Sequence, residues 1–138
     1  GLRLGMLAGA PALIQEVDKV RLPYNINVLT QQAACSALQH VSVLDEQAAL
    51  IREQREVMLK ALAAMAAVEV FPSRANFILF RLSGCDAGMV FESIRDDGIL
   101  IKNMNAQTGA LKNCLRVTVG KPEENVAFLI ALEKALVA

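Results

Sequence analysis

Three basic side chains lie in short apolar stretches, where charged groups are rarely left without a partner. The clearest is Arg116, in the segment NCLRVTVG at residues 113–120. Alternation along this segment predicts a β-strand with Leu115, Val117 and Val119 on one face and Arg116 on the other. The apolar flanks favour an interior strand of a sheet over a wet edge. Because an unpaired buried charge is costly, Arg116 needs an anion, which either the protein or a ligand must supply.

Arg3 and Lys102 are the other two basic residues of this kind. Arg3 lies between Gly1 and Gly5, and glycines keep side chains away so that a bulky anion can approach the backbone. A planar, permanently charged guanidinium suits a phosphate better than an ammonium does. One arginine for a phosphate and another for a carboxylate suggest a small ligand that carries both groups. For each residue taken singly, an ordinary structural ion pair is the competing interpretation, and we adopt it for Arg81 in FILFRL.

The composition argues against several classes of protein. The chain has 138 residues, is 54% hydrophobic and 20% charged, and carries 14 basic and 14 acidic side chains, for a formal net charge of zero. A nucleic-acid or membrane-surface binder would show a basic excess, and no apolar run has the length of a transmembrane helix or the form of a signal peptide. Three widely spaced cysteines and a single histidine, His40, argue against a disulfide framework, a metal site and a Ser-His or Cys-His catalytic pair. We therefore expect a cytoplasmic protein with free thiols and no bound metal.

The hydrophobic periodicity changes near the middle of the chain. A short strand at 2–7 is followed by expected helices over 11–20 and 28–40, the second capped by Asn27. After a break at Val41-Ser42 a longer helix follows, with Ser42 as its capping residue. Beyond it the pattern predicts strands at 68–71, 76–82, 99–102 and 114–120, with one helix from Asp86 to Asp97-Gly98 and another opening at Pro122. The chain therefore reads as the end of one domain at 1–40, a connecting helix at 41–66 and a compact α+β domain at 67–138.

Four segments together resemble one family of enzymes. GLRLG at 1–5, PYNIN at 23–27, SRANFILF at 73–80 and NCLRVTVGKPEEN at 113–125 resemble the C-terminal part of the histidinol-phosphate aminotransferases, in order and in spacing. GLRLG alone is shared by many relatives, whereas the four segments together are typical of this branch. The resemblance implies the α/β fold of the fold-type-I enzymes that use pyridoxal 5′-phosphate (PLP). This chain would supply the end of the large domain, the connecting helices and the small C-terminal α+β domain.

The resemblance also implies roles for single residues. Arg3 matches the arginine that binds the phosphate of PLP, and Arg116 matches the arginine that forms a bidentate pair with the α-carboxylate of the substrate. Lys102 falls where family members often carry an arginine that reaches the substrate's phosphate; lysine keeps the charge but loses the fork.

Three polar residues resemble positions near the family's active site. Tyr24 and Asn25 lie in a loop that resembles one near the active site and the dimer interface, although loop packing and turn formation explain PYN equally well. Asn76 either borders the substrate or satisfies backbone groups at the start of a strand.

The chain departs from the family pattern in two ways. The lysine that forms the Schiff base with PLP, and the aspartate that pairs with the pyridine nitrogen, are expected upstream of residue 1. The chain then carries no catalytic residue of its own, and we expect it to be inactive alone. The family usually has threonine where this chain has Lys121, which affects only the local stability of the last helix.

The implied reaction is transamination between histidinol phosphate and the glutamate/2-oxoglutarate pair, in histidine biosynthesis. A cytoplasmic homodimer of the full-length protein would perform it on small amino-acid and keto-acid substrates. Three alternatives stay open: a sister PLP enzyme such as an aromatic aminotransferase or a threonine-phosphate decarboxylase, a non-catalytic regulatory or dimerisation module, and an unrelated α+β binding domain whose arginines are structural.

Overall fold

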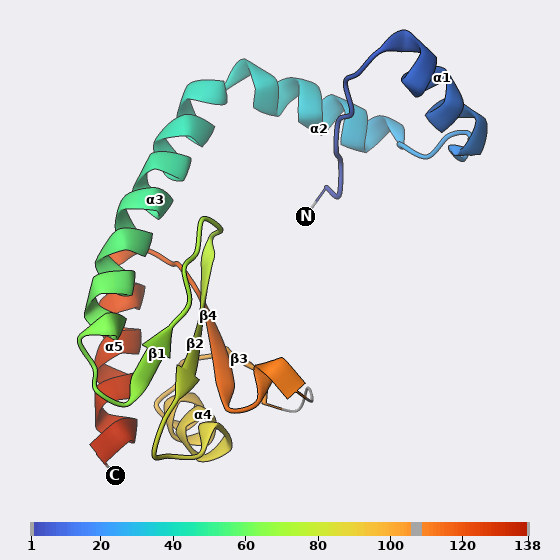
Figure 1. Ribbon diagram of the computed structural model, residues 1–138. Helices are drawn as coiled ribbons and strands as arrows, with labels where there is room; N and C mark the ends of the chain where they lie inside the picture. Colours follow the sequence, from blue (N-terminus) through green and yellow to red (C-terminus); the bar gives the residue numbers. More distant parts are fainter. Residues whose placement is uncertain (1, 106–108, 138) are drawn as a thin grey trace. The chain divides into compact units, whose positions relative to one another are not determined.

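The computed structural model describes residues 2–105 and 109–137 (Figure 1). The chain divides into two compact units, Gly1–Asp45 and Glu46–Ala138, and the boundary falls inside a long helix, α3 (Val41–Ala63). This helix covers most of the range 41–66, whose role as a connecting helix between domains stays a prediction. No helix in the described part of the chain is both long and apolar enough to cross a membrane.

The first unit contains two short helices with the predicted starts. α1 (Pro11–Val20) has a proline in its first turn, where the missing N–H is not needed. α2 (Val28–Gln39) begins after Asn27, whose side-chain oxygen accepts a hydrogen bond from the backbone N–H of Thr30 at 2.9 Å.

Two predictions for this unit are wrong. Residues 2–10 have no regular secondary structure, so the strand expected at 2–7 is absent. An extended segment becomes a strand only where a neighbouring strand takes up its backbone hydrogen bonds, and residues 2–45 contain no other strand. Ser42 does not precede the long helix but lies within its first turn, because the break between α2 and α3 is confined to His40, with φ −119° and ψ 36°.

The first unit has no hydrophobic core of its own. No residue between 2 and 45 is buried. Many of its large apolar side chains are exposed, among them Met6, Leu7, Val20, Leu22 and Leu29. Amphipathic helices gain most of their stability by burying an apolar stripe, and α1 and α2 do not do so within this unit.

The second unit is built on a four-stranded antiparallel sheet. Its strands are β1 (Val68–Val70), β2 (Phe77–Leu82), β3 (Lys102–Asn103) and β4 (Cys114–Thr118), in the order β1-β2-β4-β3. The strand that carries Arg116 therefore has a hydrogen-bonded neighbour on each side, as the apolar flanks predicted.

One face of this sheet is covered by the hydrophobic core. Alternate residues of β2 and β4, including Ile78, Phe80, Leu115 and Val117, are buried with side chains from α3, α4 (Ala87–Asp96) and α5 (Pro122–Val137). Figure 1 shows the four strands side by side, with α4 and α5 beside them. The intervening residues of β2 and β4 point to the opposite face, and most of them are partly or fully exposed. That opposite face is called the open face below.

The third strand is shorter than expected and begins later. α4 ends in the left-handed conformation of Gly98, φ 84°, with the Ile99 N–H bonded to the Ile94 carbonyl at 3.1 Å and the Gly98 N–H to the Arg95 carbonyl at 2.9 Å. This pair of bonds is a Schellman cap, as the Asp97-Gly98 signal predicted. Because the backbone of Ile99 closes the helix, pairing with β4 starts only at Lys102.

The start of α5 is stabilised from inside the helix. The Lys121 N–H donates to Glu124 Oε2 at 2.8 Å, and the Gly120 N–H donates to Asn125 Oδ1 at 2.9 Å. Asn125 is 4% exposed and also donates to the Gly120 carbonyl and to Gln54 Oε1 of α3. These side chains compensate for the absence of a capping hydroxyl at Lys121.

Candidate functional site

Arg116 lies in the middle of β4, on the open face of the sheet. Its Nε atom is buried and has no hydrogen-bond partner. None of the ion pairs among the described residues involves its guanidinium. Buried polar groups are almost always paired, so an orphaned guanidinium nitrogen indicates a partner from outside this set of residues. Of the two sources of an anion considered from the sequence, the described residues do not supply it.

Arg116 does contact an aromatic ring. The guanidinium carbon of Arg116 lies 5.0 Å from the centre of the Phe77 ring. The negative face of an aromatic ring attracts the guanidinium without accepting a hydrogen bond from any of the guanidinium N–H groups. The sequence did not lead us to predict Phe77 as a site residue. The alternation in FILFRL places Phe77 on the same face as Arg81, but only the strand register, Phe77 opposite Thr118, brings it diagonally next to Arg116.

Lys102 lies directly beside Arg116. The two residues are register partners on β3 and β4, so their side chains leave the same face of the sheet about 5 Å apart at Cβ. Lys102 is exposed and forms no ion pair with a described residue. Like charges directly opposite each other are destabilising, so this pair is favourable only when an anion lies between or above the two side chains. The geometry brings together two of the predicted site residues.

Asn76 immediately precedes β2, close to the same end of the open face. It is exposed, and its backbone carbonyl accepts a hydrogen bond from the Val119 N–H at 2.8 Å. Its side-chain amide forms no hydrogen bond with a described residue, so the bond that closes this end of the sheet comes from the backbone alone. A contact between the Asn76 side chain and a substrate stays a prediction.

Arg81, on the same open face, is fully occupied by protein groups. It donates to Glu69 Oε2 at 3.0 Å, to the Lys112 carbonyl at 3.3 Å and to the Ala110 carbonyl at 2.7 Å. Its structural role, adopted from the sequence, is confirmed.

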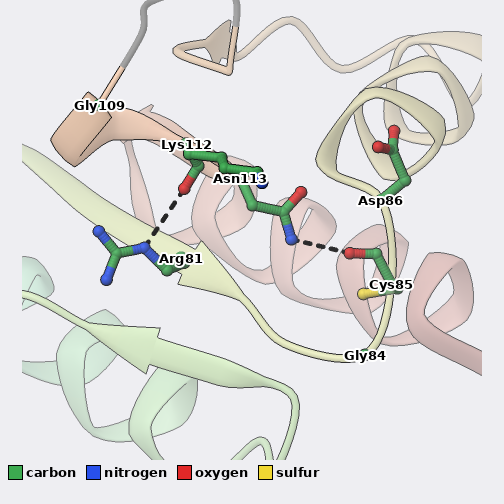
Figure 2. A pocket seen from close by; sticks show the side chains of 7 residues that line it. All are labelled: Arg81, Gly84, Cys85, Asp86, Gly109, Lys112 and Asn113. Carbon is green, nitrogen blue, oxygen red and sulfur yellow. Dashed lines mark hydrogen bonds between the residues drawn. The ribbon is translucent and has the colours of Figure 1, made fainter.

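A hollow of about 630 Å³ lies beside Arg81 (Figure 2). Much of its polar lining is already bonded: Asn113 donates to the carbonyls of Leu82 and Cys85 at 2.7 and 2.8 Å and accepts from the Ala87 N–H at 2.8 Å. Asp86 caps α4 through the Met89 N–H and that of the preceding glycine. The bonds of Asn113 and Asp86 hold β2, α4 and the start of β4 together, which is a structural role.

The other predicted site residues belong to the first unit. Arg3 is exposed, has φ 54° and forms no ion pair with a described residue. Tyr24 is 98% exposed with φ 56°, a conformation that costs a bulky residue about 1–2 kcal/mol. Asn25 accepts a hydrogen bond from Arg21 Nη1 at 3.1 Å. Tyr24 and Asn25 line one hollow of about 480 Å³ together with Leu4, Arg21, Ile26, Gln31, Ala34 and Cys35. The convergence of Arg3 and Arg116 on one ligand stays a prediction.

The chain matches proteins of known family over almost its whole length. Residues 1–132 match the model of the aminotransferase class I and II family. The chain is 54% identical over 133 residues to histidinol-phosphate aminotransferase 2 of Nitrosococcus oceani, covering 96% of this chain and 37% of that protein. It is 50% identical over 136 residues to histidinol-phosphate aminotransferase 1 of Ralstonia nicotianae, covering 99% and 36%. The chain thus spans a little over a third of the length of these curated relatives.

Solved structures confirm the predicted fold class. The histidinol-phosphate aminotransferase of Clostridium acetobutylicum matches with a TM-score of 0.76 at 23% identity, over 89% of this chain and 37% of that one. The L-threonine-O-3-phosphate decarboxylase of Porphyromonas gingivalis matches with a TM-score of 0.75 at 24% identity, over 94% and 40%. At these identities the likeness shows the fold alone, that of part of a fold-type-I enzyme. The match over residues 1–132 shows that the chain belongs to the aminotransferase class I and II family.

Proposed function

We propose that this chain is the C-terminal part of a histidinol-phosphate aminotransferase. In that enzyme an amino group moves between histidinol phosphate and the glutamate/2-oxoglutarate pair. The observation that carries the proposal is the orphaned Arg116 guanidinium on the open face, with Lys102 beside it. The curated relatives at 54% and 50% identity carry this name, which favours it over other activities of the family.

Arg116 is proposed to bind the α-carboxylate of glutamate or 2-oxoglutarate. Two N–H groups on one edge of a guanidinium match the two oxygens of a carboxylate, and this pairing fixes orientation as well as affinity. The partly buried setting strengthens the interaction relative to water. By holding the carboxylate in one orientation, Arg116 positions the carbon that exchanges the amino group.

Lys102 is proposed to bind the phosphate of histidinol phosphate, which has no carboxylate for Arg116. An ammonium acts on a phosphate as a point charge and tolerates several orientations. The adjacent Arg116 can contribute to the same phosphate, because the two side chains leave neighbouring positions of β3 and β4. One patch of two cations would then serve both substrates in turn.

PLP, the cofactor of this fold class, would meet the chain at Arg3. A phosphate would have access to Arg3, because the residue is exposed, none of the described carboxylates pairs with it, and the space beside Gly5 is open. When bound, PLP acts as the electron sink of the reaction. Arg3 would bind its phosphate through the guanidinium fork and so fix the cofactor's position.

The remaining assignments are extensions of the same proposal. Tyr24 and Asn25, which line an exposed hollow, are proposed to lie near the active site and the dimer interface. The Asn76 amide, which forms no hydrogen bond with a described residue, would border the substrate at the edge of the open face. The full-length protein would be a cytoplasmic homodimer.

A second activity of the same fold is the alternative. The threonine-phosphate decarboxylase matches with a TM-score of 0.75, nearly that of the aminotransferase at 0.76, so the backbone does not separate the two. Both substrates carry a phosphate, which Lys102 suits equally. The sequence relatives favour the aminotransferase.

The test uses the full-length protein that carries this chain. It should convert histidinol phosphate only when 2-oxoglutarate is present, and it should release no carbon dioxide from threonine phosphate. Arg116→Lys keeps the charge but removes the fork, and we expect kcat/KM for 2-oxoglutarate to fall about 100-fold at an unchanged melting temperature. Carbon dioxide release would establish the alternative, and a loss of folding without an intrinsic loss of activity would mark Arg116 as structural.

A further inference from the structure

Arg116 and Phe77 form a pair whose geometry suits preparation for a ligand. The ring centre lies 5.0 Å from the guanidinium carbon, and Phe77 is 37% exposed. A carboxylate at this place would neutralise the guanidinium and compete with an incoming substrate. A ring holds the guanidinium through its π face and leaves the N–H edge available.

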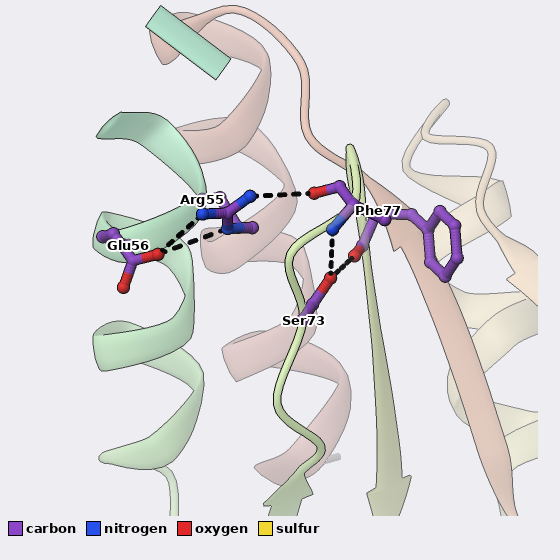
Figure 3. A network of polar contacts seen from close by, with 5 residues as sticks. Arg55, Glu56, Ser73 and Phe77 are labelled. Atoms are coloured by element: carbon purple, nitrogen blue, oxygen red, sulfur yellow. Dashed lines mark hydrogen bonds and ion pairs between the residues drawn. The ribbon is translucent and has the colours of Figure 1, made fainter. Parts of the chain in front are cut away.

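Phe77 is itself held by the turn that precedes β2 (Figure 3). Ser73 Oγ donates to the Phe77 carbonyl at 2.6 Å and accepts from the Ala75 N–H at 3.1 Å. These two bonds fold residues 73–77 into one compact turn. The backbone bond from the Val119 N–H to the Asn76 carbonyl, at 2.8 Å, ties the same turn to the residue that directly follows β4, the strand of Arg116.

The turn is anchored in its position by α3. Arg55 Nη1 donates to the Ala75 carbonyl at 3.4 Å, while its Nε and Nη2 donate to Glu56 Oε1 at 3.2 and 3.1 Å. The Arg55 side chain is only 11% exposed, so this is a fixed contact and not a mobile surface pair. Contacts therefore run without a gap from α3 through the turn to Phe77 and Arg116.

We propose that Phe77 is a positioning residue for Arg116, held in place by Ser73 and Arg55. This rests on the proposed function, in which Arg116 binds a carboxylate. A preset guanidinium loses less rotamer freedom when the substrate arrives, and side-chain ordering is a large part of the cost of binding. Removal of the ring should therefore weaken carboxylate binding more than it weakens the fold.

The other end of the open face offers a matched control. The Arg81 guanidinium carbon lies 5.1 Å from the centre of the Phe71 ring, almost the same distance as in the Arg116 pair. Arg81, however, is already fixed by Glu69 and two carbonyls. Loss of the Phe71 ring should leave substrate binding unchanged.

The experiment compares Phe77→Leu, Phe77→Tyr and Phe71→Leu in the full-length protein. For Phe77→Leu we expect KM for 2-oxoglutarate to rise about fivefold with kcat within a factor of two, the size of one partly exposed cation–π contact. Phe77→Tyr keeps the ring and should restore KM to within about twofold. Phe71→Leu should leave this KM at the parent value.

Ser73→Ala provides a second route to the same answer, because it loosens the turn without touching the ring. It should raise KM for 2-oxoglutarate about twofold, in the same direction as Phe77→Leu. A fall in melting temperature without a change in KM, or an equal effect from Phe71→Leu, would overturn the proposal. If Arg116→Lys also leaves KM and kcat unchanged, the carboxylate role of Arg116 fails with it. If only Arg116→Lys has an effect, the positioning role alone is wrong.

Discussion

The open face of the sheet carries two arginines in nearly identical local settings and with opposite surroundings. Arg81 lies on β2 and Arg116 on the adjacent strand β4, and each has a phenylalanine ring about 5 Å from its guanidinium carbon. Arg81 is neutralised by Glu69 and bonded to two backbone carbonyls, whereas the buried Nε of Arg116 has no partner and its strand neighbour is another cation. The strand position and the aromatic contact do not distinguish a binding arginine from a structural one. What distinguishes them is whether the described residues supply an anion: Glu69 pairs with Arg81, and none of them pairs with Arg116.

The largest expected difference between Arg116 and Arg81 is in the effect of their replacement on activity. Arg116→Met should lower kcat/KM for 2-oxoglutarate at least about 100-fold, because the carboxylate loses both charge and bidentate hydrogen bonds. The free energy of unfolding should stay the same or increase, since a methionine relieves both the orphaned nitrogen and the repulsion from Lys102.

Arg81→Met is the control variant that matches Arg116→Met. It should leave kcat/KM near the parent value and lower the free energy of unfolding by about 1–2 kcal/mol, because two carbonyls and Glu69 lose their donor. Steady-state kinetics and urea denaturation of the full-length protein measure both quantities. Equal losses of activity in the two variants would show that the two arginines do not differ in function.

Asn113 should show the largest effect on stability alone. Its side chain bonds the carbonyls of Leu82 and Cys85 and the Ala87 N–H, and its backbone has φ 58°. Asn113→Ala removes all three bonds and puts at φ 58° a residue that tolerates the left-handed region less well than asparagine does, so we expect about 3 kcal/mol of destabilisation by urea denaturation. Asn113→Gly tolerates the backbone conformation and should lose less. A loss below about 0.5 kcal/mol for both variants would contradict the role of Asn113 in joining β2, α4 and β4.

Much of this architecture is predictable from local sequence signals. The starts of α1 and α2, the caps at Asn27 and Asp86, and the Schellman end at Gly98 depend on residues within one turn of each other. The alternation around Arg116 likewise gives its face of the strand. Such signals are local because the hydrogen bonds that they describe are local.

The parts that were wrong or missed depend on distant residues. The strand expected at 2–7 is absent, because strand formation requires a pairing partner that no local pattern supplies. The Phe77 contact with Arg116 follows from the register of β2 with β4, and these strands are joined by a long stretch of chain. The adjacency of Lys102 to Arg116 depends on the same kind of long-range pairing. The sequence therefore predicts site residues but not their contacts.

Lys102 should have an intermediate effect that depends on the substrate. Lys102→Gln removes the charge proposed to bind the phosphate, so KM for histidinol phosphate should rise about tenfold while KM for 2-oxoglutarate changes less than about twofold. The free energy of unfolding should increase by about 0.5 kcal/mol, because Arg116 loses a like-charged neighbour. Lys102→Arg keeps the charge and should keep the KM. A Lys102→Gln variant with an unchanged KM for histidinol phosphate would place the phosphate elsewhere.

The smallest effect is expected at the ion pair between Glu69 and Arg81. The side chains of Arg81 and Glu69 are 32% and 55% exposed, and such pairs contribute little after solvent screening. Glu69→Gln should lower the free energy of unfolding by about 0.5 kcal/mol at low salt, and this difference should shrink in 1 M sodium chloride. KM for 2-oxoglutarate should not change, because the carbonyls of Ala110 and Lys112 still hold Arg81 in place. A rise in that KM would mean that the two arginines share one electrostatic environment, and the functional contrast between them would no longer rest on their separate partners.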